Sequence, residues 1–241
     1  MLFWVLLLLS APSLFADAPD VSQSLQQADS AYAQRADLAK AREALQAYER
    51  AILAGAGTEA YWKASRAAWW VADNAASRSE KLVTFQKGID EAKAGLARDP
   101  NCVECHFWLG ANYGSFGETK GILKSLSLVK PIRQEMAEVI RINDRFQGGG
   151  GYRVLGAMDY KVPAIAGGSK KRALDELNKA LAIDPNDPFT HYYLAEFYQV
   201  TGDKAKMKAE WETMKSLKVS DDVKPEQAML RAKGEKLFER R

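Results

Sequence analysis

Between residues 184 and 217, apolar side chains recur three and four positions apart, the spacing of two short amphipathic helices. The first stripe consists of His191, Leu194, Ala195 and Tyr198, and the second of Met207, Trp211 and Met214. Gly202-Asp203 lies between them and predicts a tight turn. Because one such hairpin cannot bury its apolar faces alone, we expect further copies that stack on it.

The pattern that begins at Asp184 also begins at Asp99. The residues that are identical at equivalent positions are Asp99, Pro100, Asn101, His106, Leu109, Tyr113 and Gly117, matching Asp184, Pro185, Asn186, His191, Leu194, Tyr198 and Gly202. This ladder of small, apolar and aromatic positions resembles the tetratricopeptide repeat over most of residues 24–217. The resemblance implies an all-α domain, residues 24–241, in which helical hairpins stack in a superhelix. We expect the charged segment 226–241 to form a C-terminal capping helix.

Five helix pairs are expected before that cap, and two of them carry unusual features. Pro131 interrupts a long apolar-rich helix over 122–142, so we expect a kink or a split there. The helix over 58–75 is dense in aromatic residues, with Trp62 and Trp69 on one face. Such a stripe is more typical of a core than of a ligand-binding wall.

The chain opens with an apolar stretch, residues 2–9, followed by small residues up to Ala16. The stretch is shorter than the roughly 20 residues that a membrane-spanning helix needs. It predicts a signal peptide over 1–16, cleaved after Ala16, and then a polar linker over 17–23. Export predicts a periplasmic location, and an uncleaved anchor is the alternative.

Charge and composition narrow the functional classes. The 34 basic and 31 acidic residues nearly balance, and no concentrated basic stripe of the kind that binds nucleic acid occurs. No Ser-His-Asp arrangement, pair of catalytic carboxylates or metal-ligand cluster stands out. We therefore expect neither an enzyme nor a metal site nor a bound cofactor.

The sharpest short motif is Cys102-Val-Glu-Cys105-His106. In an exported protein this spacing is the attachment signature of a c-type haem, with the histidine as axial ligand. However, His106 has its repeat twin in His191, which has no cysteines beside it, so the histidine belongs to the repeat. A short-range disulfide or a small apolar pair at a helix start are the alternatives, and a redox-active dithiol stays open.

Two glycine clusters each precede a helix and a basic residue. They are Gly148–Gly151 before Arg153, and Gly167-Gly168-Ser169 before Lys170. Backbone amides at helix N-termini attract anions. Since neither cluster matches a nucleotide-binding motif, we favour sharp turns, with Ser169 capping a helix.

The concave face of a tetratricopeptide stack is lined by the first helix of each pair. On this basis the predicted ligand or partner groove consists of Phe107, Arg153, Tyr192, Glu196 and Gln199. An arginine among aromatic side chains suits a peptide carboxylate or an amphipathic organic anion. The alternative is that these residues only make contacts between neighbouring repeats.

Several segments go beyond a generic repeat. They are Gly114–Gly121, Leu128–Arg133, Gln147–Gly156, Lys161–Pro163 and Gly167–Lys171. Together they resemble the periplasmic T-component family of TRAP transporters. The resemblance implies association with a solute-binding protein, a homo-oligomer, and channels that shelter a small apolar organic acid. This chain lacks the lipidation cysteine that members of that family often carry.

The leading hypothesis is a periplasmic helical-repeat interaction protein, the T-component of a TRAP-type transporter that docks a solute-binding protein. An envelope-assembly scaffold that binds peptide segments is the alternative in the same class. An electron-transfer protein that uses Cys102, Cys105 and His106 is the competing class.

Overall fold

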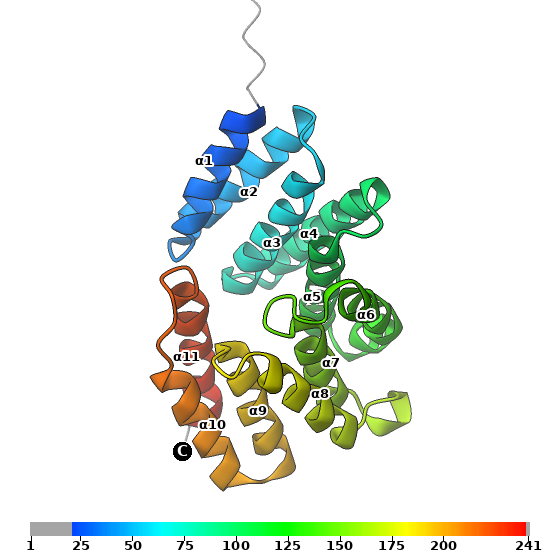
Figure 1. The fold of residues 1–241 in the computed structure, drawn as a ribbon, viewed down its shortest axis with the longest axis vertical. Helices are drawn as coiled ribbons and strands as arrows, with labels where there is room; N and C mark the ends of the chain where they lie inside the picture. Colours follow the sequence, from blue (N-terminus) through cyan, green and yellow to red (C-terminus); the bar gives the residue numbers. More distant parts are fainter. Residues whose placement is uncertain (1–20, 240–241) are drawn as a thin grey trace, which may run out of the picture.

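The computed structural model describes residues 21–239, which are all-helical and contain no strand (Figure 1). Eleven α-helices and one short 3-10 helix follow one another along this range. The helices are α1 (Val21–Ala33), α2 (Leu38–Leu53), α3 (Thr58–Asn74), α4 (Arg78–Arg98), α5 (Val103–Lys120), α6 (Ile122–Asn143), α7 (Gly150–Lys161), η1 (Ala164–Ala166), α8 (Lys170–Ile183), α9 (Pro188–Thr201), α10 (Lys204–Ser216) and α11 (Lys224–Phe238).

Neighbouring helices pack as hairpins, α1 with α2 and so on to α9 with α10. The first helices of successive hairpins, from α3 to α9, also contact one another, and α11 continues that row by packing on α9 and α10. Each hairpin buries its apolar stripe against its own partner and the next hairpin. This arrangement confirms the predicted superhelix of tetratricopeptide-like repeats.

Polar side chains start several of these helices where the sequence turns. The carboxylate of Asp37 accepts a hydrogen bond from the backbone amide of Ala39 at 2.8 Å. Ser77 accepts one from the amide of Glu80 at 3.1 Å. Such caps satisfy backbone amides that have no partner inside the helix. Gly202 ends α9 with a φ of 85°, a left-handed conformation that glycine adopts without strain.

Two boundaries differ from the sequence-based expectation. The first helix begins at Val21, inside the predicted linker 17–23, because Val21 packs against the apolar cluster of Ala51, Ala56 and Ala60. The helix that contains Pro131 is not split there, since α6 runs through this residue as one element. The predicted signal peptide, 1–16, lies outside the described residues.

The curved row of hairpins brings its two ends together (Figure 1). In the turn between α1 and α2, Arg35 donates two hydrogen bonds to Glu226 of α11, at 2.9 Å and 2.6 Å. These residues are 191 positions apart in the chain. Lys233 of α11 pairs with Asp73 of α3 at 2.7 Å. The hairpins therefore form a closed ring.

An apolar cluster reinforces this closure. It joins buried residues of α1, α2 and α3 with residues of α9, α10 and α11, among them Tyr32, Trp70, Tyr192, Met229 and Leu230. Burial of these side chains stabilises the contact between distant repeats. Within residues 21–239, no helix is both long enough and apolar enough to cross a membrane.

We expect Glu226→Ala to lower the free energy of unfolding by about 3 kcal/mol, because it leaves a buried arginine without its carboxylate. The side chains of Arg35 and Glu226 are 7% and 16% exposed. The matched control is Glu43→Ala, which removes an exposed pair with Lys40 and should change the stability far less, because solvent screens that pair. Chemical denaturation measures both. Equal small losses would mean that this ion pair does not hold the ring closed.

Candidate functional site

The ring encloses a central cavity of about 690 Å³, which lies in the range of small-ligand and peptide sites. Its wall is built mainly from α1, the first helices α3, α5, α7 and α9, and the closing helix α11. The aromatic lining residues are Tyr32, Trp69, Phe107, Trp108, Phe189, Tyr192 and Tyr193. Asp222, Val223, Glu226, Met229, Leu230 and Lys233 complete the wall from the C-terminal end. The cavity therefore depends on ring closure.

Four of the five predicted groove residues line this cavity: Phe107, Arg153, Tyr192 and Glu196. The fifth, Gln199, does not line it and is exposed near the end of α9. Gln199 shares a helix face with Tyr192 and Glu196 but lies one turn beyond the cavity, so its place in a groove stays a prediction. The binding function of the other four stays a prediction.

Arg153 has one guanidinium nitrogen, Nη1, engaged within the protein. It donates to the carboxylate of Asp187 at 2.7 Å and to the carbonyl of Gln147 at 3.0 Å. Its guanidinium carbon lies 5.3 Å from the ring centroid of Phe189. Arg153 is 5% exposed and connects α7 with the start of α9. It is thus an inter-repeat contact as well as a lining residue, and its charge is already compensated.

A second charged group lies on the wall between α5 and α9. Lys161 pairs with Glu118 at 3.0 Å and with Glu196 at 3.4 Å, and the hydroxyl of Tyr160 donates to Glu196. Burial by itself would lower the pKa of Lys161, but the two glutamates raise it above its ordinary value. Burial, together with Glu196, raises the pKa of Tyr160 well above its ordinary value. The lysine stays charged and the tyrosine neutral.

Arg66 of α3 also lines the cavity, and the sequence analysis missed it. Its guanidinium carbon lies 3.9 Å from the ring centroid of Tyr32 and 5.0 Å from that of Trp62. In residues 21–239, no carboxylate oxygen lies within 4 Å of its nitrogens, and its buried Nε has no hydrogen-bond partner. Burial raises the pKa of Tyr32 to about 12, although Arg66 and Arg35 lower it.

Two tryptophans lie on the same wall as Arg66. Trp69 packs against the core cluster, as predicted for this aromatic stripe, and also lines the cavity. Its indole N–H donates to Ser115 at 3.0 Å, and its ring lies 5.8 Å from that of Trp108. The buried indole nitrogen of Trp108 has no hydrogen-bond partner. The spacing of Arg66 between Trp62 and Trp69 was the available signal, since these three residues share one helix face.

Cys102 and Cys105 form a disulfide, with their Cα atoms 5.2 Å apart. Cys102 is the N-cap of α5, and its sulfur accepts a hydrogen bond from the amide of Cys105 at 3.1 Å. In the last repeat, the equivalent pair is Asp187 and Thr190, where the carboxylate of Asp187 accepts from the amide of Thr190 at 2.8 Å. Both repeats therefore keep the capping hydrogen bond, and the disulfide takes the place of the side-chain hydrogen bond that Thr190 donates to Asp187 at 2.5 Å.

The haem hypothesis for this motif is wrong. Both sulfurs are used by the disulfide, so neither thiol can bond to a haem. The Nε2 of His106 donates to the carbonyl of Pro100 at 3.0 Å, and its Nδ1 contacts Glu135 at 2.6 Å. His191 makes the same two contacts, with Pro185 at 2.8 Å and Glu210 at 2.6 Å. The histidine braces each Asp-Pro turn against the second helix of its hairpin.

Both glycine clusters are sharp turns, as favoured from the sequence. The amide of Gly148 donates to the carbonyl of Arg145 at 3.1 Å, and that of Gly150 to Phe146 at 2.8 Å. In the second loop, the amide of Gly168 donates to Pro163 at 3.1 Å, and Ser169 caps α8. These amides are therefore already paired.

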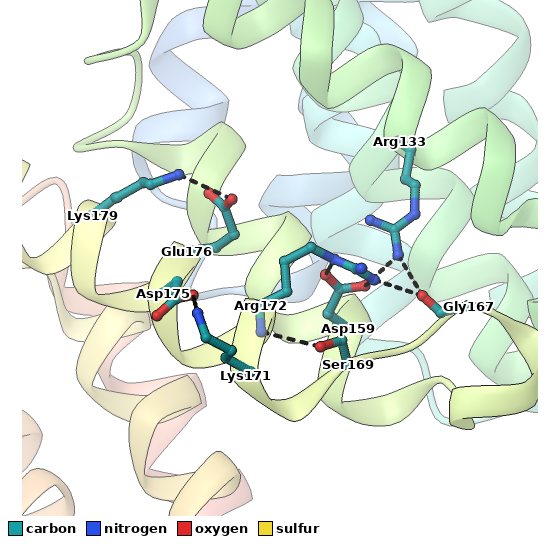
Figure 2. Close-up of polar contacts among 9 residues, drawn as sticks. All are labelled: Arg133, Asp159, Gly167, Ser169, Lys171, Arg172, Asp175, Glu176 and Lys179. Carbon is teal, nitrogen blue, oxygen red and sulfur yellow. Dashed lines mark hydrogen bonds and ion pairs between the residues drawn. The ribbon is translucent and has the colours of Figure 1, made fainter.

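Asp159 anchors the second loop from inside α7. Figure 2 shows the guanidinium groups of Arg133 and Arg172 converging on its carboxylate and on the carbonyl of Gly167. Arg172 binds through two nitrogens, at 2.6 Å and 3.0 Å, and the side chain of Asp159 is fully buried. Lys171 pairs instead with Asp175 at 2.8 Å. This cluster holds the loop between α7 and α8 in place.

A smaller and more apolar pocket of about 240 Å³ adjoins the central cavity. Its walls come from α5, α6 and α7 and include Tyr113, Ile122, Leu126, Val129, Ile132 and Met158. Gly114, Glu118, Val154 and Lys161 line both spaces. The two are therefore neighbouring compartments that share one wall.

The fold defines a tetratricopeptide-like helical-repeat protein. The chain belongs to the family described as Regulator of microtubule dynamics protein 1-3, whose family model matches residues 24–239. The resemblance to the T-component family stays a prediction. A search among curated proteins found no match.

A solved structure supports the fold. The crystal structure of TTC0263, a thermophilic TPR protein in Thermus thermophilus, superimposes with a TM-score of 0.63. The two chains are 19% identical, and the match covers 89% of this chain and 96% of that chain. At this identity the likeness concerns the fold alone.

We expect the folded protein to lose stability as the pH rises above about 6.5, the ordinary pKa of histidine. Burial by itself would lower the pKa of His106 and His191, but their hydrogen bonds to Glu135 and Glu210 and to the proline carbonyls raise it. A raised pKa gives stability that is fully present below pH 6.5. That stability is lost as the pH rises through the folded-state pKa.

Urea denaturation between pH 6 and pH 9 measures this effect, which should be on the order of 1 kcal/mol per histidine. The chain contains two histidines, so the double variant His106→Gln/His191→Gln removes both. Its stability should vary less with pH over this interval. If the free energy of unfolding depended on pH equally in the variant and the wild type, the hydrogen bonds of the two histidines would not be the cause of that dependence.

Proposed function

We propose that the protein binds an extended segment of a partner protein inside its central cavity and acts as an interaction module, not as an enzyme. The observation that carries this proposal is the aromatic, densely charged cavity formed by the first helices and closed by α11. Aromatic faces and fixed charges bind peptide segments with little loss of side-chain freedom.

The adjoining pocket supports a peptide ligand. It is mainly apolar and shares a wall with the central cavity, so an apolar side chain of the bound segment can enter it while the backbone stays in the main cavity. Glu118 and Lys161 lie at the boundary and supply polar partners for backbone groups. A site that holds the backbone of a segment and buries one of its side chains prefers certain sequences, because only some side chains fit the pocket.

The family description refers to regulation of microtubule dynamics. From it we carry over to this chain only a function that works through protein contacts. The periplasmic T-component and the envelope-assembly scaffold stay proposals about which partner provides the segment. Both would use the same cavity.

Site-specific photo-crosslinking tests the proposal. A photoreactive amino acid at Ala33, an exposed residue on the cavity lining, should capture a partner segment in cells that make the protein. The same amino acid at Val83, which is 61% exposed and outside the cavity lining, is the matched control. We expect a covalent protein adduct from Ala33 that is at least tenfold stronger than that from Val83.

The captured peptide identifies the partner by mass spectrometry. A solute-binding protein would favour the transporter hypothesis, and an envelope-assembly protein would favour the scaffold. Adducts of equal strength from Ala33 and Val83, or none from Ala33, would contradict binding in the cavity.

Export is a separate prediction that rests on the apolar N-terminal stretch. We expect the mature protein to begin at Asp17, because cleavage follows Ala16. Intact-mass measurement of the protein recovered from the envelope fraction checks this. A mass that includes residues 1–16 would contradict cleavage.

A further inference from the structure

We propose that the wall formed by α3 and α5 is a carboxylate-binding subsite, in which Arg66 pairs with a single carboxylate of the bound segment. The inference rests on the proposed function and names the chemical group that the cavity recognises. The cations of the cavity lining are not all paired with a carboxylate.

Nearly every cation of the lining has a carboxylate partner. Arg35 pairs with Glu226, Arg153 with Asp187, Lys161 with Glu118 and Glu196, and Lys233 with Asp73. Among the lining residues that the structure describes, Arg66 is the one cation with no carboxylate oxygen within 4 Å. Its guanidinium is instead stacked on Tyr32 and lies beside the hydroxyl of Tyr48, which donates to Asp29. A planar guanidinium held on an aromatic face is preorganised for the planar, two-oxygen geometry of a carboxylate.

The carboxylates of the lining disfavour a ligand with two negative charges. Seven carboxylate residues line the cavity, namely Asp29, Asp73, Glu118, Asp187, Glu196, Asp222 and Glu226. One uncompensated arginine can neutralise one carboxylate. The second charge of a phosphate dianion would lie without a partner among these acidic groups, and like charges in a partly buried site repel each other strongly.

Trp108 provides a second donor on the same wall. Its indole N–H is buried without a partner, whereas the indole of Trp69 beside it is satisfied by Ser115. A buried donor without a partner costs free energy, which a ligand acceptor recovers when the surrounding side chains move to admit it. Arg66 and Trp108 both line the cavity and are bridged by Trp69, which follows Arg66 on α3 and stacks near Trp108. Together they form a wall that supplies donors.

Three pools of random heptapeptides test the inference on the mature protein by affinity selection. The first pool has free C-termini and no Asp or Glu, the second has amidated C-termini and no Asp or Glu, and the third has amidated C-termini with Asp and Glu allowed. We expect binding from the first or third pool that is about ten- to hundredfold tighter than from the second. The first identifies a terminal carboxylate as the source, and the third identifies an acidic side chain.

Arg66→Gln should weaken the selected acidic peptides by the same ten- to hundredfold. Arg66→Lys keeps the charge but loses the two parallel donors of the guanidinium, so it should weaken the binding of these peptides less. The matched control is Arg42→Gln on α2, a half-exposed arginine outside the cavity that pairs with Glu80, and it should bind as the wild type does.

A measurement on the wild-type protein avoids any dependence on how the variants fold. The indole N–H resonance of Trp108, assigned with Trp108→Phe, should shift when the selected peptide binds and stay in place with the variant peptide in which that carboxylate is an amide. Equal affinity for amidated neutral peptides would overturn the inference and leave the proposed function standing, as would an unchanged affinity of Arg66→Gln. If no pool binds, the proposed function fails and the inference falls with it.

Discussion

The contact between the two ends of the repeat row is the constraint on which the rest of the structure depends. Without Arg35 against Glu226 and the apolar cluster beneath them, the hairpins would form an open superhelix with a shallow concave face. With that contact, α11 becomes one wall of a central cavity, and its apolar residues Met229 and Leu230 are buried. The capping helix therefore does more than end the stack, because it also completes the candidate binding site.

Within the ring, the two equivalent repeats share the hydrogen bonds of a histidine but differ in the residues that cap its helix. His106 and His191 each connect the carbonyl of an Asp-Pro turn with a glutamate on the next helix, which fixes the angle between successive elements. The helix that carries the histidine is capped by Cys102, which is bonded to Cys105, in one repeat and by Asp187, which pairs with Thr190, in the other. In the latter, the carboxylate of Asp187 also binds Arg153, so the same cap ties two repeats together. Local capping and long-range packing thus use the same atoms.

The repeat architecture could be predicted because helical periodicity and the Asp-Pro turns are local features of the chain. Phe107, Arg153, Tyr192 and Glu196 could be placed on the concave face for the same reason. Ring closure could not be predicted, since a contact between residues 191 positions apart produces no repeating pattern in the amino-acid sequence. Arg66 was missed because an uncompensated charge is recognised only when every possible partner has been located. The state of Cys102 and Cys105 was left open, because their spacing alone suits several chemistries.

The distance between the α1–α2 turn and α11 tests the account most directly. Spin labels at Ala36 and Glu235, both exposed, report this distance in solution by pulsed electron resonance. The account predicts a single narrow distribution at short distance in the wild-type protein, and a broader, longer one when Glu226 is replaced by alanine. A broad, long distribution in the wild type would contradict the closed ring, and with it the cavity on which the proposed function depends.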